Sequence, residues 1–160
     1  MARIREHTYT TTVTWTGNRG TGTSGYRDYD RTTDIEAPGR PVLPSSSDPL
    51  FRGDPARWNP ELLLVAALSQ CHLLWYLHLC SDAGVVVESY VDEPVGVLAE
   101  EVGGPGRFTE VVLRPRIVVA APDMVDRARQ LHARAHELCY IAQSVNFPVR
   151  HEPTVSAAGG

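Results

Sequence analysis

An uncharged run over residues 62–81 constrains the fold of this chain more than any other feature of its sequence. The run is preceded by strong signals for a helix start. Asn59 suits the N-cap, Pro60 suits the first helical position, and Glu61 places an acid in the first turn. The spacing therefore predicts a helix over 59–81, which would span about 33 Å.

A run of this length is also long enough to cross a membrane. Four polar side chains interrupt it, namely Ser69, Gln70, His72 and His78. Polar groups are expensive in the hydrocarbon core of a bilayer, and the flanking sequence is typical of strands. We therefore interpret the run as the buried central helix of a globular fold, covered by other elements on most of its sides.

The rest of the chain alternates between strand-like segments, a loop and a second helix. We expect an N-terminal hairpin over 8–36 (strands 8–16 and 26–36), a loop over 37–58, strands within 85–120, a helix over 122–144 and a closing strand over 147–155. Pro115 predicts an edge strand or a bulge, because proline cannot donate to a ladder. This order predicts one α+β domain over 1–160.

Composition excludes several classes of function. All fifteen basic residues are arginine, so a Schiff-base lysine is excluded and arginine is the only permanent cation available to a site. The net charge of −4, without a basic cluster, argues against a nucleic acid or an anionic membrane as partner. The N-terminal residues lack the apolar core of a signal peptide, which leads us to expect a cytoplasmic protein.

Three cysteines in a reducing compartment suggest functional thiols rather than a disulfide framework. Cys71 and Cys80 lie nine residues apart on the predicted helix, or about 13–14 Å, which is too far for a disulfide. Cys139 lies on the second predicted helix and can approach Cys71 if the two helices pack. The alternative is that these thiols are inert core residues, as most buried cysteines are.

Reactivity of Cys71 would need help from its surroundings. Burial raises the pKa of a thiol, and Cys71 lies too far from the helix start to benefit from the helix dipole. An arginine is the cation that remains, and an arginine on an apolar surface needs a carboxylate partner. Glu61 is the acid that fits this role, about 15 Å away along the helix.

Histidines offer two alternatives. His132 and His136 lie at i, i+4 with Cys139 three residues further on, which is part of a zinc-site pattern, although H-E-x-x-H is absent. An exposed histidine pair is the expectation we prefer. His72 follows Cys71 directly, but adjacent helical residues point about 100° apart, so a Cys-His nucleophile is poorly supported.

Two separated motifs resemble the OsmC/Ohr family of thiol-dependent hydroperoxide reductases. Residues 59–63 read Asn-Pro-Glu-Leu-Leu and Cys71 follows Glu61 by ten residues, similar to the N-P-E-x-L…C motif of that family. Residues 135–142 and 144–149 resemble its second cysteine helix and closing strand. The resemblance implies the OsmC-like fold, with antiparallel sheets packed around two long helices in an intertwined homodimer.

The same resemblance implies a mechanism. Cys71 would attack an organic hydroperoxide and become a sulfenic acid, and Cys139 would resolve it as a disulfide. A dithiol, of lipoyl type or a small thiol, would then reduce the pair. An arginine held by Glu61 would stabilise the thiolate, and no metal, haem or flavin would be needed.

The resemblance leaves the arginine open. One branch of the family carries it in the first hairpin, which corresponds to Arg19, and the other in the loop before N-P-E, which corresponds to Arg52. Arg19 is preferred here and Arg52 is kept. The expected apolar pocket involves Trp75, Tyr76 and Phe51. The alternative function is a non-catalytic OsmC-like binding or thiol-sensing module.

Overall fold

The uncharged run forms one long helix, α1 (Pro60–Asp82), in the computed structural model, which describes residues 4–159. The predicted cap is present, since the N–H of Leu62 donates to Asn59 Oδ1 at 2.8 Å. At the other end Gly84 has a φ of +70°, which glycine adopts without strain, and the helix stops there. Capping residues therefore set both ends of α1 within a residue or two of the prediction.

The chain divides into two compact units, Met1–Leu63 and Leu64–Gly160. Of the domain predicted over 1–160, residues 1–3 and 160 lie outside the described part of the chain. The first unit contains one antiparallel sheet of order β1-β2-β3 and a short 3-10 helix. Its elements are β1 (Thr12–Trp15), β2 (Thr33–Glu36), β3 (Leu43–Ser45) and η1 (Pro49–Phe51).

Two expectations for this unit need correction. The strands predicted over 8–16 and 26–36 are shorter, because residues before Thr33 form an irregular loop. Arg31 holds this loop: its guanidinium stacks on the rings of Tyr26 and Tyr29 at 4.4 and 4.0 Å and donates to both of their carbonyls. The segment 37–58 is not a bare loop, since it contains β3 and η1.

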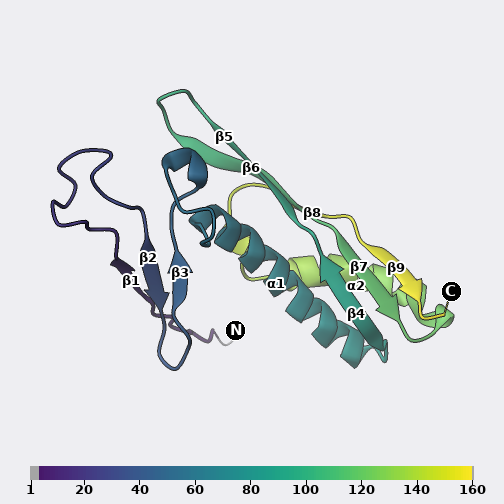
Figure 1. Cartoon of the computed structure of the whole chain (residues 1–160). Helices are drawn as coiled ribbons and strands as arrows, with labels where there is room; N and C mark the ends of the chain where they lie inside the picture. Colours follow the sequence, from purple (N-terminus) through teal and green to yellow (C-terminus); the bar gives the residue numbers. More distant parts are fainter. Residues whose placement is uncertain (1–3, 160) are drawn as a thin grey trace. The chain divides into compact units, whose positions relative to one another are not determined.

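The second unit contains two three-stranded sheets and the second helix (Figure 1). Their orders are β4-β7-β9 and β5-β6-β8. The pairs β4–β7 and β5–β6 are antiparallel, whereas β9 runs parallel to β7 and β8 runs parallel to β6. The elements are β4 (Val87–Asp92), β5 (Val95–Glu100), β6 (Gly106–Leu113), β7 (Pro115–Val119), η2 (Pro122–Met124), α2 (Val125–Leu138), η3 (Ala142–Ser144), β8 (Val149–His151) and β9 (Thr154–Ala157).

The α+β class is confirmed, with four differences in detail. Both sheets of this unit are mixed rather than antiparallel, because β8 and β9 join them in parallel. The closing strand predicted over 147–155 is two strands, β8 and β9, and the helix predicted over 122–144 ends at Leu138. Pro115 lies in a central strand rather than at an edge or a bulge. The fold tolerates it because it is the first residue of β7, and pairing with β9 begins only at Arg116.

One stripe of α1 forms the core of the second unit. Leu68, His72, Tyr76 and Cys80 recur every four residues and are all buried. Tyr76 and Cys80 pack with α2 and the β4-β7-β9 sheet, and Leu68 packs with β6 and β8. Helical periodicity therefore places α1 between two clusters of apolar side chains.

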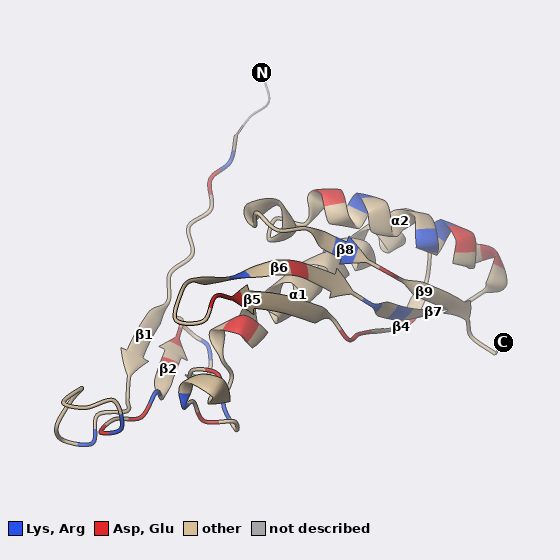
Figure 2. Cartoon of the chain, turned by 90° about the horizontal axis from the view of Figure 1, so that it is seen from above, with Lys and Arg blue, Asp and Glu red and all other residues tan. Residues whose placement is uncertain are grey.

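The remaining surface of α1 stays uncovered within one chain. By length and composition this helix could cross a membrane. Its most apolar 18-residue stretch has a mean hydropathy of 1.5, and only 17% of that stretch is buried. Core helices of soluble proteins meet the same criterion. Leu74 is 58% exposed, and Figure 2 shows α1 tan over most of its visible length, in contrast to the charged α2. The expectation of a helix covered on most sides is therefore wrong for the single chain.

Asp92 ties three elements of the second unit together, and its removal is expected to destabilise the fold. It accepts hydrogen bonds from Ser69 Oγ at 2.5 Å and from the N–H of Arg114 at 2.7 Å. Asp92→Ala leaves both donors without this partner, so we expect a loss of about 2–3 kcal/mol of unfolding free energy in urea titrations. The matched control is Glu93→Ala, whose ion pair with Arg116 is exposed and whose midpoint should hardly move. Equal losses in the two variants would contradict this role.

Candidate functional site

Two of the three thiols meet in the second unit. Cys71 lies on α1 and is partly exposed, whereas Cys139 follows the last residue of α2 and is 1% exposed. The Cys71 side chain is close enough to act on the Cys139 thiol, and both thiols are free. The structure therefore brings together the cysteines that the sequence pairs.

Cys71 lies beside the stripe of α1 that faces the core. Leu74 and His78, which share its side of the helix, are both exposed. His72, one residue further along, is on the buried stripe instead. Cys71 consequently lies at the border between the core and the surface, where a thiol can be reached by a small molecule.

The end of α2 determines where the Cys139 sulfur points. Cys139 leaves the helical conformation, with φ −69° and ψ 104°, and the chain then turns back on itself. The N–H of Gln143 donates to the Cys139 carbonyl at 3.0 Å, and the N–H of Ala142 donates to its Sγ at 3.4 Å. The break in the helix predicted to reach residue 144 thus surrounds this sulfur with backbone.

The surroundings of Cys139 keep it protonated at neutral pH. Burial raises the pKa of this thiol to about 11; the Ala142 N–H opposes the shift, and the neighbouring Cys71 adds to it. A protonated thiol is a weak nucleophile, so Cys139 is unsuited to attack a peroxide first.

Cys80 is remote from this pair in its packing. It is buried in the apolar cluster that contains Tyr76 and Val119, and burial raises the pKa of its thiol. These surroundings are typical of a structural, unreactive cysteine.

A cluster of histidines that the sequence did not predict lies in the same unit. His72 and His132 are both 1% exposed, and their Nε2 and Nδ1 atoms are 3.0 Å apart. The His151 ring lies 5.5 Å from that of His72 and 5.6 Å from that of His136, and Tyr76 stacks on His132 at 4.0 Å. The expectation of an exposed His132–His136 pair is therefore wrong. Helical periodicity could have predicted the burial of His132, since His132 follows the buried Ala128 by four residues.

The imidazoles of His72 and His132 are neutral over the physiological range. Burial, followed by the charges of His151 and His136, lowers the pKa of His72 to about 4. Burial and the charges of His72 and His151 lower the pKa of His132 to about 3. Within residues 4–159, no group of three or more His, Cys, Asp or Glu side chains is arranged to hold a metal ion. The zinc alternative through His132, His136 and Cys139 therefore gains no support.

The predicted arginines and Glu61 belong to the first unit. Arg19 is engaged locally: it donates to the carbonyls of Asp28 and Arg27 and lies 3.8 Å from Asp30. Arg52 is exposed and has a left-handed backbone, with φ +65°. Its guanidinium lies 5.8 Å from the centre of the Tyr26 ring.

Glu61 presents a carboxylate oxygen that needs a partner. Its Oε2 atom is buried, and no hydrogen bond reaches it from the described residues. A buried carboxylate oxygen of this kind is stabilised by a cation, and a guanidinium suits it best. The predicted role of Glu61 as an anchor for an arginine is consistent with this state.

An open apolar hollow lies on α1 beyond Cys71. Leu74, Trp75 and His78 line it, with a volume of about 310 Å³. The Trp75 ring also makes an edge-to-face contact with Tyr140, the residue after Cys139, at 5.6 Å. Trp75 thus lines an apolar hollow on the surface of α1. Tyr76 does not, because it is fully buried against His132.

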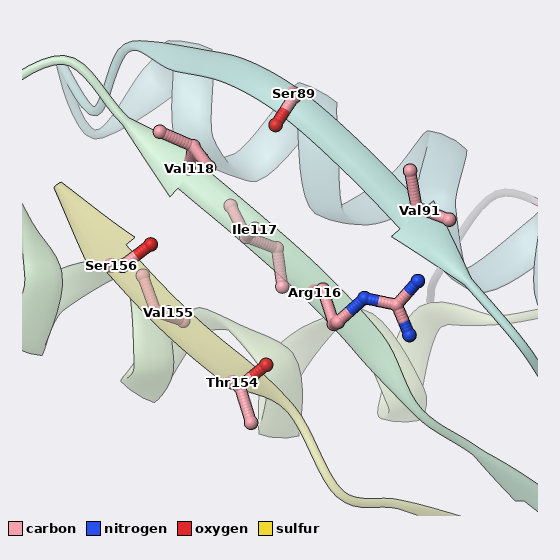
Figure 3. A pocket seen from close by; sticks show the side chains of 8 residues that line it. All are labelled: Ser89, Val91, Arg116, Ile117, Val118, Thr154, Val155 and Ser156. Carbon is pink, nitrogen blue, oxygen red and sulfur yellow. The ribbon is translucent and has the colours of Figure 1, made fainter. Parts of the chain in front are cut away.

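A second hollow lies on the open face of the β4-β7-β9 sheet (Figure 3). It is a shallow groove of about 410 Å³, lined by small hydroxyl and aliphatic side chains and by Arg116. Arg116 is already paired with Glu93 at 2.5 Å, and no thiol or imidazole is among the lining side chains. We therefore do not assign this groove to the redox site.

Comparisons with known proteins agree with the geometry. The family profile described as OsmC-like protein matches residues 53–154. An OsmC-like protein of unknown function from Vibrio cholerae is 32% identical, with a TM-score of 0.82 over 93% of this chain and 100% of its own. No curated protein matches the chain.

Two structures of organic hydroperoxide resistance proteins share the fold. The one from Elizabethkingia anophelis has a TM-score of 0.66 at 17% identity, covering 97% of this chain and 99% of its own. The one from Legionella pneumophila has a TM-score of 0.66 at 20% identity, covering 94% and 99%. At these identities the likeness concerns the fold alone.

Proposed function

We propose that this chain, which belongs to the OsmC family, is a cysteine-based peroxidase that reduces organic hydroperoxides. The observation that carries the proposal is the meeting of a partly exposed thiol, Cys71, with a buried protonated thiol, Cys139. Similar folds occur in proteins named for resistance to organic hydroperoxides. Such a protein would act in the cytoplasm, in defence against oxidative stress.

The proposed reaction has three steps. The Cys71 thiolate attacks the hydroperoxide, so that an S–O bond forms, the O–O bond breaks and the alcohol leaves with a proton. Cys139 then attacks the sulfenic acid sulfur, which forms the disulfide and releases water. A dithiol, of lipoyl type or a small thiol, reduces the disulfide and is itself oxidised. The apolar hollow beside Trp75 suits the carbon chain of an organic peroxide.

The activating cation is the part of the site that we reassign. Arg19, which the sequence favours, uses its guanidinium on the carbonyls of its own hairpin. The Arg52 guanidinium lies near the Tyr26 ring, and within residues 4–159 no hydrogen bond or ion pair occupies its N–H donors. We propose that Arg52 stabilises the Cys71 thiolate and that Glu61 fixes the guanidinium.

Arg52→Met is expected to lower the second-order rate constant for cumene hydroperoxide about a hundredfold, because the thiolate loses its counter-charge. Stopped-flow tryptophan fluorescence measures this constant. Arg19→Met is the matched control and should change the constant less than about fivefold. A large loss in Arg19→Met with little loss in Arg52→Met would return the role to the hairpin.

The uncovered face of α1 supports an assembly of two chains. An apolar helix with Leu74 and Leu77 exposed is costly in water, and a second copy is the usual cover in a homo-oligomer. We propose a homodimer that buries the part of this face outside the hollow beside Trp75.

Turnover distinguishes an enzyme from a thiol-sensing module. With excess dithiol, the enzyme should consume many equivalents of cumene hydroperoxide per chain. It should reduce cumene hydroperoxide faster than it reduces hydrogen peroxide. A sensing or binding module oxidises once and stops. A single slow oxidation, without continued peroxide consumption, would therefore support the module and contradict the enzyme.

A further inference from the structure

We propose that the reductant attacks the sulfur of Cys71, and that Cys139 is the leaving group in that step. The inference rests on the proposed function, because it concerns the disulfide that this function forms. It assigns different roles to the two halves of the Cys71–Cys139 bond: one receives the external thiol and the other is released.

The two sulfurs differ in how easily an external thiol can reach them. Cys71 is partly exposed on α1, whereas the Cys139 side chain is 1% exposed. The Ala142 amide lies 3.4 Å from the Cys139 Sγ, so backbone already occupies one side of this atom. Thiol–disulfide exchange needs an approach to the attacked sulfur along the S–S direction, and access is one of the factors that decide its rate. An external thiolate can therefore reach Cys71 far more readily than Cys139.

One backbone donor faces the sulfur that is released. When the S–S bond breaks, the negative charge appears on the Cys139 sulfur, and the Ala142 N–H already points at this atom. Burial nevertheless raises the pKa of this thiol to about 11, and a thiol of higher pKa leaves more slowly. Access to Cys71 therefore decides the direction of attack, and the Cys139 sulfur takes up a proton as it is released.

Protonation then keeps the released sulfur from reversing the step. The pKa of the Cys139 thiol is raised to about 11, first by burial. At pH 7 only about one such thiol in ten thousand is deprotonated. The displaced Cys139 therefore takes up a proton and attacks the new mixed disulfide slowly, which leaves time for a second thiol to complete the reduction.

The reduction of the disulfide takes two successive thiol–disulfide exchanges. The first thiolate forms an S–S bond to Cys71 and breaks the bond to Cys139, which takes up one proton. The second thiolate, from the same dithiol or another molecule, attacks the reductant sulfur and releases Cys71. Two reductant thiols are oxidised to one disulfide, and two protein thiols are restored.

The test traps the mixed disulfide in the full chain carrying Cys80→Ala. Diamide first forms the Cys71–Cys139 disulfide, 2-mercaptoethanol is added, acid stops the reaction within a second, and N-ethylmaleimide in denaturant then blocks the released thiols. Peptide mass spectrometry should find 2-mercaptoethanol on Cys71 and maleimide on Cys139, at least tenfold over the reverse pattern. Equal or reversed labelling overturns the proposal, and so does failure of diamide to link the two cysteines.

Single-thiol variants give an independent readout. In the Cys80→Ala background, Cys139→Ser leaves Cys71, and Cys71→Ser leaves Cys139. Ellman's reagent at pH 8 should react with Cys71 at least a hundredfold faster than with Cys139, and equal rates would overturn the proposal. Because no peroxide is used in either experiment, failure of the peroxidase assay together with labelling at Cys71 would reject the proposed function alone.

Discussion

Cys71→Ser is expected to lower the rate of cumene hydroperoxide reduction by at least about a thousandfold, because a hydroxyl cannot replace a thiolate as the attacking group. The second-order rate constant, measured by peroxide consumption in the presence of a dithiol, reports this loss. The fold should survive, since the Cys71 side chain is only partly buried and serine is smaller than cysteine. An unchanged thermal midpoint would show that chemistry was lost rather than structure.

Two further cysteine variants separate the roles of the thiols. Cys139→Ser should keep the fast first step but accumulate a sulfenic acid on Cys71, which dimedone labels. Cys80→Ala is the matched control, because Cys80 lies in the apolar cluster with Tyr76 and makes no contribution to the proposed chemistry. Loss of activity in Cys80→Ala at an unchanged thermal midpoint would contradict the assignment of the pair.

Acidification is expected to destabilise the fold through the buried histidine pair. The pKa values of His72 and His132 are lowered from 6.5 to about 4 and about 3, chiefly by burial. The unfolded chain therefore binds more protons than the folded chain below pH 6.5. The stabilisation is present above pH 6.5 and is lost as pH falls toward 4 and 3. For the pair, we expect a loss of about 4 kcal/mol between pH 6.5 and 4.5.

Urea titrations across this pH range test the prediction with two matched variants. His72→Phe should reduce the slope of unfolding free energy against pH by about 1.4 kcal/mol per pH unit, because one titrating group is removed. His78→Phe is the matched replacement at an exposed position beside Asp82, outside the buried pair. Equal slopes in the wild type and His72→Phe would contradict the account of the buried pair.

Local signals explain why α1 could be predicted closely. An asparagine cap, a proline at the first position and a glycine with positive φ act within a few residues of each helix end. The second helix has no such stop signal. It ends at Leu138 because the backbone of Cys139 leaves the helical conformation. Packing decides this end, and no capping residue in the sequence marks it.

The candidate site was predictable in part, for the same reason. Motif spacing pairs Cys71 with Cys139, and the fold brings the two thiols close. The burial of His132 was not foreseen, because a histidine beside charged residues on a helix is expected to be exposed, whereas its position in the periodic stripe places it in the core. The choice between Arg19 and Arg52 depends on local hydrogen bonds in loops, which the sequence pattern does not encode.

Disulfide mapping after one equivalent of cumene hydroperoxide tests the central claim most directly. The fully reduced protein is mixed with the peroxide, stopped with acid within seconds, blocked with N-ethylmaleimide in denaturant, and digested for mass spectrometry. Our account predicts that Cys71 and Cys139 are linked in most chains while Cys80 carries the maleimide. Maleimide on all three cysteines, or a bond through Cys80, would contradict it.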